Sequence, residues 1–196
     1  ALAPLPEAFG VARVVMTSLQ AVSGAGRSPG VGSMDIIDNI VPYIPKEEEK
    51  VERETQKLLG AFSANGITPA AFPVSATCTR VPVLDAHTEA VTVALEKPAA
   101  LPDVAAAMRG FGRDINPRTH PSAPERWLSV HEDPFRPQPR VDREADGGMT
   151  TSVGRLREES VLGPGVKFVL VSHNTKMGAA KGAILVAAGL EVRGWL

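Results

Sequence analysis

The stretch 77–89, TCTRVPVLDAHTE, constrains the fold more than any other part of this chain. Most of it is apolar and β-branched, which is typical of strands, but Pro82 and a later Asp-Ala pair interrupt the run. Because proline cannot continue a central strand, one unbroken strand is excluded. We therefore expect a strand over 70–79, a tight connection, and a second strand over 88–96.

Arg80 and His87 lie in that connection. Their odd spacing would place them on opposite faces of a continuous strand, whereas a bend allows both side chains to meet at one edge of the sheet. A guanidinium there suits bidentate capture of a carboxylate, and a histidine beside Arg80, Asp85 and Glu89 suits a tuned acid or base. The alternatives, a surface arginine and a structural histidine at a turn, remain open at this point.

Composition narrows the class of protein. The 196 residues suffice for one large domain or two small ones, and 43% hydrophobic with 22% charged residues is ordinary for a globular protein. A net charge of −1 favours neither nucleic acid nor an anionic membrane as partner. No apolar run reaches the roughly 18–20 residues of a membrane span. The four histidines show no ligand spacing, so we expect no metal.

Cys78 is the only cysteine, which excludes an internal disulfide and fits a reducing compartment, so we expect a cytoplasmic protein. A lone cysteine is either a nucleophile or a small hydrophobe. Its position in the middle of a strand, between two threonines, favours the second interpretation.

The hydrophobic pattern predicts an α+β fold in which helices cover one face of a mixed or antiparallel sheet. The expected strands are 11–19, 70–79, 88–96, 149–157 and 166–172, with a short one at 127–131. The expected helices are 34–40, 45–59, 102–111 and 178–188.

The helix over 45–59, PKEEEKVERETQKLL, begins with a proline and three glutamates, which are typical of helix N-termini. Glu47, Lys50 and Arg53 share one face because they are three residues apart. Composition alone favours a solvated charged face. A lysine in the first turn opposes the helix dipole, however, and this becomes favourable if an anion binds there.

Two glycine-rich stretches allow close approach of the backbone. After Gln20 comes AVSGAGRSPGVGS, which is either a mobile surface loop or a cradle for phosphate or a cofactor. Gly24 and Gly26 begin a dinucleotide fingerprint, but Pro29 stands in place of its third glycine, so that motif fails. The small residues that open helix 178–188 approach either a ligand or a neighbouring strand.

Six segments carry a resemblance to a known family. They are MTSLQAVSGAG, SMDIIDNIVPYIPKEEEKVERETQKLLG, VSATCTRVPVLDAHTEAV, HPSAPERWLSV, RPQPRVDREADGGMTTSVGR and VLVSHNTKMGAAKGAILVA. In this order they resemble the C-terminal catalytic and dimerisation domain of the archaeal/fungal-type aspartate-semialdehyde dehydrogenases. The resemblance implies that residues 1–196 are this one domain, with a fold like the C-terminal domain of glyceraldehyde-3-phosphate dehydrogenase. The family's N-terminal Rossmann domain and its nucleophilic cysteine would lie outside this sequence.

The resemblance also implies an activity and an assembly. Enzymes of this family reduce aspartyl phosphate with NADPH, giving aspartate semialdehyde and phosphate for lysine, threonine, methionine and isoleucine synthesis. The implied partners are the small-molecule substrate and further copies of the chain, as a homodimer or homotetramer, without nucleic acid or membrane.

By resemblance, individual residues take roles in that reaction. His87 resembles the general acid/base, Arg80 the clamp for the substrate α-carboxylate and Glu47 the partner of its ammonium group. Lys50 resembles the phosphate-binding lysine, and Gln20 the glutamine that orients the substrate.

By resemblance, Ser23, Gly24 and Asn174 match residues that approach NADP. The domain outside this sequence would make most of the contacts to the cofactor. Ala86 departs from the pattern, which has glycine before the histidine. If this position needs a positive φ, alanine costs roughly 1 kcal/mol and changes the direction of His87.

Two competing interpretations remain. One is a related reductase, acting on malonyl-CoA or on N-acetyl-glutamyl phosphate. By resemblance, Glu47 argues for a substrate with an amino group and so against malonyl-CoA. The other is a catalytically silent dimerisation module.

Overall fold

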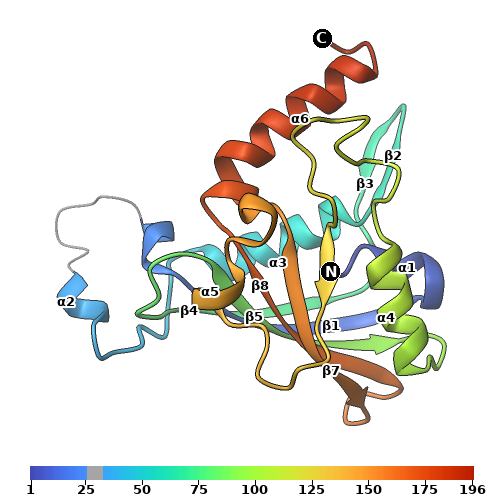
Figure 1. Ribbon diagram of the computed structural model, residues 1–196. Helices are drawn as coiled ribbons and strands as arrows, with labels where there is room; N and C mark the ends of the chain where they lie inside the picture. Colours follow the sequence, from blue (N-terminus) through green and yellow to red (C-terminus); the bar gives the residue numbers. More distant parts are fainter. Residues whose placement is uncertain (26–32) are drawn as a thin grey trace.

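A mixed six-stranded sheet organises the chain in the computed structural model, which describes residues 1–25 and 33–196 (Figure 1). Its strands run in the order β4–β1–β5–β8–β7–β6. The pairs β1–β4 and β6–β7 are parallel, and the other pairs are antiparallel. The strands are β1 (Val11–Gln20), β4 (Val74–Arg80), β5 (His87–Leu95), β6 (Leu128–Val130), β7 (Thr151–Glu159) and β8 (Gly165–Ser172). A separate hairpin joins β2 (Ala61–Ser63) to β3 (Gly66–Thr68).

The expected long and medium helices are present, with shifted ends. The α-helices are α1 (Pro4–Phe9), α2 (Ser33–Ile36), α3 (Glu47–Leu58), α4 (Leu101–Gly110), α5 (Pro139–Asp142) and α6 (Lys181–Val192). Short 3-10 turns occupy Val22–Ala25 and Ala145–Gly148, and a π-turn at Lys176–Ala180 leads into α6. Helix α6 extends away from the sheet (Figure 1). None of the described helices is long and apolar enough to cross a membrane.

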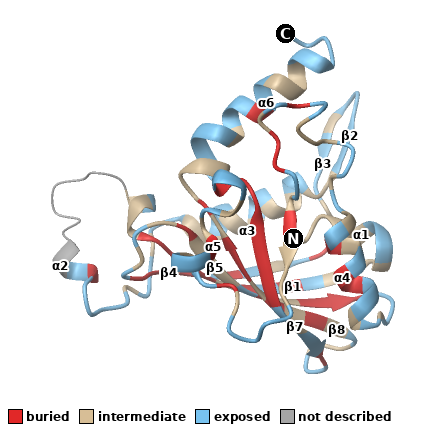
Figure 2. Ribbon diagram, in the orientation of Figure 1, coloured by how far each residue is buried: buried red, intermediate tan, exposed pale blue. Residues whose placement is uncertain are grey.

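One face of the sheet forms the core. The strand register aligns Val14 with Val93 and Val166, and aligns the next layer, Met16, Val91 and Phe168, in the same way. Leu5 of α1 and both Val104 and Met108 of α4 are fully buried against this face. Figure 2 shows the buried residues concentrated along these strands. The expected α+β fold is confirmed.

Helix α3 runs along β4, the edge strand of the sheet, and bonds its outer backbone groups. A helix rises about 6 Å over four residues and a strand about 6.7 Å over two, so side chains spaced by four can match every second strand residue. Two bonds follow this match: the N–H of Cys78 donates to Oε1 of Glu48 and the N–H of Ala76 donates to Oε1 of Glu52, each at 2.9 Å. Just before the strand, Nε2 of Gln56 donates to the carbonyl of Phe72 at 3.0 Å. The solvated charged face is therefore only part of this helix, the side that exposes Arg53 and Glu54.

The sequence predicted a tight connection between β4 and β5. The structure shows instead that the two strands are not neighbours in the sheet. β1 lies between the two strands, so residues 81–86 cross over the end of β1. Backbone bonds fasten this crossing to the end of β1 and to the turn that follows it. These bonds are Val81 N–H to Gln20 O (3.0 Å), Val22 N–H to Val83 O (2.8 Å) and Ser23 N–H to Leu84 O (3.1 Å).

Candidate active site

The ends of three strands meet at one edge of the sheet. Gln20 and Arg80 are register partners at the ends of β1 and β4, while Leu19 pairs with Thr88 of β5. His87, the first residue of β5, therefore lies beside Gln20. Gln20 and Arg80 are only 5% and 8% exposed, so their polar groups need partners within the protein.

Ala21 supplies hydrogen-bond partners through its backbone for two candidate side chains, the catalytic His87 and the substrate-binding Arg80. Its N–H donates to Nδ1 of His87 at 3.0 Å, and its carbonyl accepts from Nη1 of Arg80 at 2.7 Å. Because Nδ1 accepts a hydrogen bond, the neutral imidazole carries its proton on Nε2. The sequence analysis missed Ala21, since a backbone contact leaves no side-chain signal.

The charge state of His87 follows from its surroundings. Burial and, next, the positive charge of Arg80 lower its pKa from 6.5 to about 4, while Glu47 acts in the opposite direction. His87 is therefore neutral near pH 7. Asp85 and Glu89, the other neighbours expected from the sequence, are not among the charges that act on it.

The first turn of α3 joins the same cluster. Nε2 of Gln20 donates to Oε1 of Glu47 at 3.3 Å, and Nζ of Lys50 lies 3.8 Å from Oε2 of Glu47. The Lys50 side chain is 51% exposed, so its ammonium group is accessible to a ligand in solution. A carboxylate and an ammonium group thus stand on the helix that flanks Arg80.

Gly24 lies close to the side chains of His87 and Arg80. A Cβ at this position would lie 2.9 Å from Nη1 of Arg80 and 3.1 Å from Cε1 of His87, both closer than ordinary contact. Only glycine therefore leaves this side of the imidazole uncovered.

Asn174 connects the glycine-containing turn with the crossing segment. Its Nδ2 donates to Oγ of Ser23 and its Oδ1 accepts from the N–H of Ala86, each at 2.9 Å. Ala86 has a φ of 78°, so the positive φ considered from the sequence is present. All eight residues singled out from the sequence, Gln20, Ser23, Gly24, Glu47, Lys50, Arg80, His87 and Asn174, belong to one connected region.

Cys78 does not belong to the reactive part of this region. Its side chain is fully buried in the core, and burial together with nearby glutamates raises the pKa of its thiol to about 11. The interpretation of Cys78 as a small hydrophobe is confirmed. Over residues 1–25 and 33–196, no group of three or more His, Cys, Asp or Glu side chains is arranged to hold a metal.

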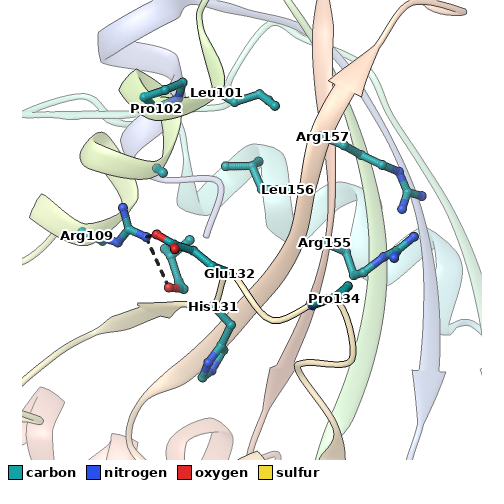
Figure 3. A pocket seen from close by; sticks show the side chains of 11 residues that line it. Leu101, Pro102, Arg109, His131, Glu132, Pro134, Arg155, Leu156 and Arg157 are labelled. Carbon is teal, nitrogen blue, oxygen red and sulfur yellow. Dashed lines mark hydrogen bonds and ion pairs between the residues drawn. The ribbon is translucent and has the colours of Figure 1, made fainter.

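A separate cavity of about 520 Å³ lies between α4, β7 and the segment that follows β6 (Figure 3). Leu156 projects between the helix and the strand, while Arg155 and Arg157 point to the other side of β7 (Figure 3). Arg109 of α4 pairs with Glu132 at 3.4 Å. None of the eight residues above lines this cavity.

Fold and site together define a class: an α+β domain that presents a neutral imidazole, a buried guanidinium and a carboxylate where β1 and β4 end and β5 begins. Comparison with known proteins identifies the family. The profile of the semialdehyde dehydrogenase dimerisation domain matches residues 2–177, and the chain belongs to this family.

Named relatives agree with that assignment. Over 189 residues the chain is 48% identical to an aspartate-semialdehyde dehydrogenase of Methanothermobacter thermautotrophicus, covering 95% of this chain and 53% of the relative. The Saccharomyces cerevisiae enzyme is 43% identical over 200 residues, covering 98% and 54%. A crystal structure of the Candida albicans enzyme with NADP superposes with a TM-score of 0.84 at 40% identity, again covering 98% and 54%. The chain thus spans about half the length of the relatives it matches.

Proposed function

We propose that this chain is the substrate-binding and dimerisation part of an NADP-dependent aspartate-semialdehyde dehydrogenase. The reaction is the reductive dephosphorylation of L-aspartyl-4-phosphate to L-aspartate-4-semialdehyde. The observation that carries the proposal is the pair of bonds through which Ala21 holds His87 and Arg80 side by side. The Rossmann domain and the nucleophilic cysteine belong to the remaining half of the polypeptide, which the coverage of 53–54% of the relatives supports.

The charges of the cluster match the substrate. Arg80 suits the α-carboxylate because a guanidinium offers two parallel N–H donors. Glu47 suits the ammonium group, and Lys50 at the start of α3 suits a phosphate, since the helix N-terminus adds favourable potential there. Gln20, bonded to Glu47, orients the substrate between them.

His87 acts in this scheme as a proton donor at Nε2. The Ala21 N–H occupies Nδ1, so the neutral ring has one exchangeable proton, and it lies on the nitrogen that the glycine above leaves uncovered. A neutral donor of this kind stabilises an oxyanion that forms at the reacting carbonyl. To accept a proton at Nε2, as a base must, the ring first has to release this one.

The reduced cofactor, NADPH, would supply the hydride when bound. The residues present fit a cofactor at this side of the cluster, because a side chain at Gly24 would fill the space above His87. Ser23, Gly24 and Asn174 would contact it, while the missing domain would provide most of the binding.

We also propose that the chain assembles as a homodimer or homotetramer through the sheet face opposite the core. Val15 is 42% exposed on this face, and its neighbours Ser75, Thr77 and Ala90 are exposed as well. Mass measurement by light scattering on Val15→Lys should give a smaller species than the unchanged protein.

The expected site of action is the cytoplasm, where the free thiol of Cys78 stays reduced.

The central test is a steady-state assay of the full-length protein with aspartate semialdehyde, phosphate and NADP. His87→Asn keeps an oxygen acceptor for the Ala21 N–H and leaves no donor at the position of Nε2, so kcat should fall by roughly 10²–10⁴-fold without unfolding. His120→Asn, outside the cluster, serves as the matched control. Undiminished activity of His87→Asn would contradict the role of this residue.

The same assay separates the competing functions. Malonyl-CoA or N-acetyl-glutamyl phosphate with NADPH should support little turnover, and Glu47→Gln should raise the KM for aspartate semialdehyde. Activity toward malonyl-CoA alone would identify the related reductase. Full-length protein inactive with all three substrates would identify a silent dimerisation module.

A further inference from the structure

The residue before His87 adopts a backbone conformation that alanine disfavours. Ala86 has a φ of 78° and is completely buried. In this left-handed region the Cβ approaches the following carbonyl oxygen, which raises the free energy of any residue other than glycine. The conformation persists only where surrounding contacts impose it.

Asn174 makes the side-chain contact to Ala86. It follows β8, whose last residue, Ser172, is the register partner of His87. From this position Oδ1 accepts the N–H of Ala86 and Nδ2 donates to Ser23, both at 2.9 Å. The neighbouring His173 is only 3% exposed, so the segment that carries Asn174 is fixed in the fold.

The direction of the His87 side chain depends on the peptide that precedes it. Rotation of Ala86 toward negative φ would turn that peptide and carry the imidazole away from the Ala21 N–H, which is 3.0 Å from Nδ1. The Arg80 guanidinium, bonded to the same Ala21, would then lose its neighbour.

We propose that Asn174 is a positioning residue that holds Ala86 in the left-handed conformation and thereby aims His87 at the reacting carbonyl. The effect on turnover rests on the proposed function, while the effect on the position of the imidazole does not.

This role is distinct from a contact with the cofactor and compatible with it. An asparagine amide has two N–H donors and two oxygen lone pairs, and the protein uses one of each here. One donor and one lone pair therefore remain for NADP. An experiment must separate the two roles, because loss of Asn174 removes both.

The test is a double-mutant cycle in the full-length enzyme, combining Asn174→Ala with Ala86→Gly. Glycine adopts a positive φ without support, so it should reduce the need for the asparagine. We expect Asn174→Ala to lower kcat about tenfold by itself and clearly less when Ala86→Gly is also present. Asn174→Asp, which keeps an oxygen for the Ala86 N–H, should lose less kcat than Asn174→Ala and serves if the alanine variant does not fold.

Thr175→Ala, a change at the next position, is the control for the segment and should leave kcat unchanged. If Asn174 acts only on the cofactor, its loss raises the KM for NADP equally with and without Ala86→Gly. Equal losses of kcat in both backgrounds would overturn the proposal.

A second measurement does not require turnover. An NMR titration of the His87 imidazole should give a pKa of about 4 in the unchanged protein. Burial and the charge of Arg80 lower this pKa, and the charge of Glu47 opposes the shift. In Asn174→Ala this pKa should rise toward 6.5 as the ring moves away, and Ala86→Gly should restore it. An unchanged pKa in Asn174→Ala would refute the positioning role even if the proposed reaction were wrong.

Discussion

In two regions of the molecule, polar side chains form hydrogen bonds with backbone groups. The bonds stabilise a strand edge in one region and orient a candidate catalytic side chain in the other. Along β4, the α3 side chains Glu48 and Glu52 bond two successive outer N–H groups of the strand, and Gln56 bonds the carbonyl of Phe72 just before it. Where β1 ends and β5 begins, the Ala21 N–H holds the ring of His87, and the Asn174 side chain holds the N–H of Ala86.

This difference predicts which substitutions should lower stability and which should lower activity. The α3–β4 contact repeats, buries an edge and needs no ligand, so its loss should lower the free energy of unfolding. In the second region one hydrogen bond orients the His87 ring and one holds the Ala86 N–H, so a small displacement there should alter chemistry more than stability.

The largest expected effect is a loss of activity from a change in the turn Val22–Ala25, which is bonded to the crossing. Gly24→Ala places a methyl group 2.9 Å from Nη1 of Arg80 and 3.1 Å from the imidazole, which must shift. Displacement of catalytic groups by about 1 Å costs on the order of 10²-fold in kcat/KM, measured with the full-length enzyme. Gly110→Ala, where no atom lies within 4 Å, is the control. Full activity of the Gly24→Ala variant would contradict the expectation that small displacements in this region reduce activity.

Next in size is a change in the strand edge. Glu52→Ala leaves the Ala76 N–H without its acceptor and should cost about 1–3 kcal/mol in urea unfolding, with kcat unchanged. Glu54→Ala on the exposed side of the same helix should cost less than about 0.5 kcal/mol. Equal costs for the two variants would show that α3 does not stabilise β4 in this way.

A smaller effect concerns pH. The folded-state pKa of His87, about 4, is below its ordinary 6.5, so the unfolded chain binds the extra proton first as pH falls. His87 therefore lowers stability progressively from about pH 6.5 to 4. His87→Asn should flatten this slope by on the order of 1 kcal/mol per pH unit, measured by urea unfolding across that range. His131→Asn provides a comparison at a histidine outside the crossing.

The smallest effect is expected at Ala86. Ala86→Gly relieves a left-handed alanine but removes a buried methyl group, so the net gain should not exceed about 1 kcal/mol. Ala90→Gly, in the middle of β5, should instead destabilise the protein by roughly 0.5–1 kcal/mol. A loss at both positions would contradict the assignment of strain to Ala86.

Local pattern was sufficient for most elements, whereas most of the candidate site residues were chosen by resemblance to a family. The β-rich run 11–19 became β1, the acidic segment became α3, and the interruption at Pro82 separated β4 from β5. The hairpin β2–β3 was not predicted, because strands of three residues are too short to show an alternating pattern.

What the sequence by itself determined is therefore which residues are strand-like, which segment is a helix, and that arginine and histidine flank a break. Only the tertiary structure decided that β1 lies between β4 and β5, that Ala21 holds Arg80 and His87, and that Asn174 bonds Ala86 from 88 residues away. The physical reason is that periodicity reports short-range preferences of side chains. Long-range hydrogen bonds to backbone groups, which every residue carries, leave no mark in the sequence.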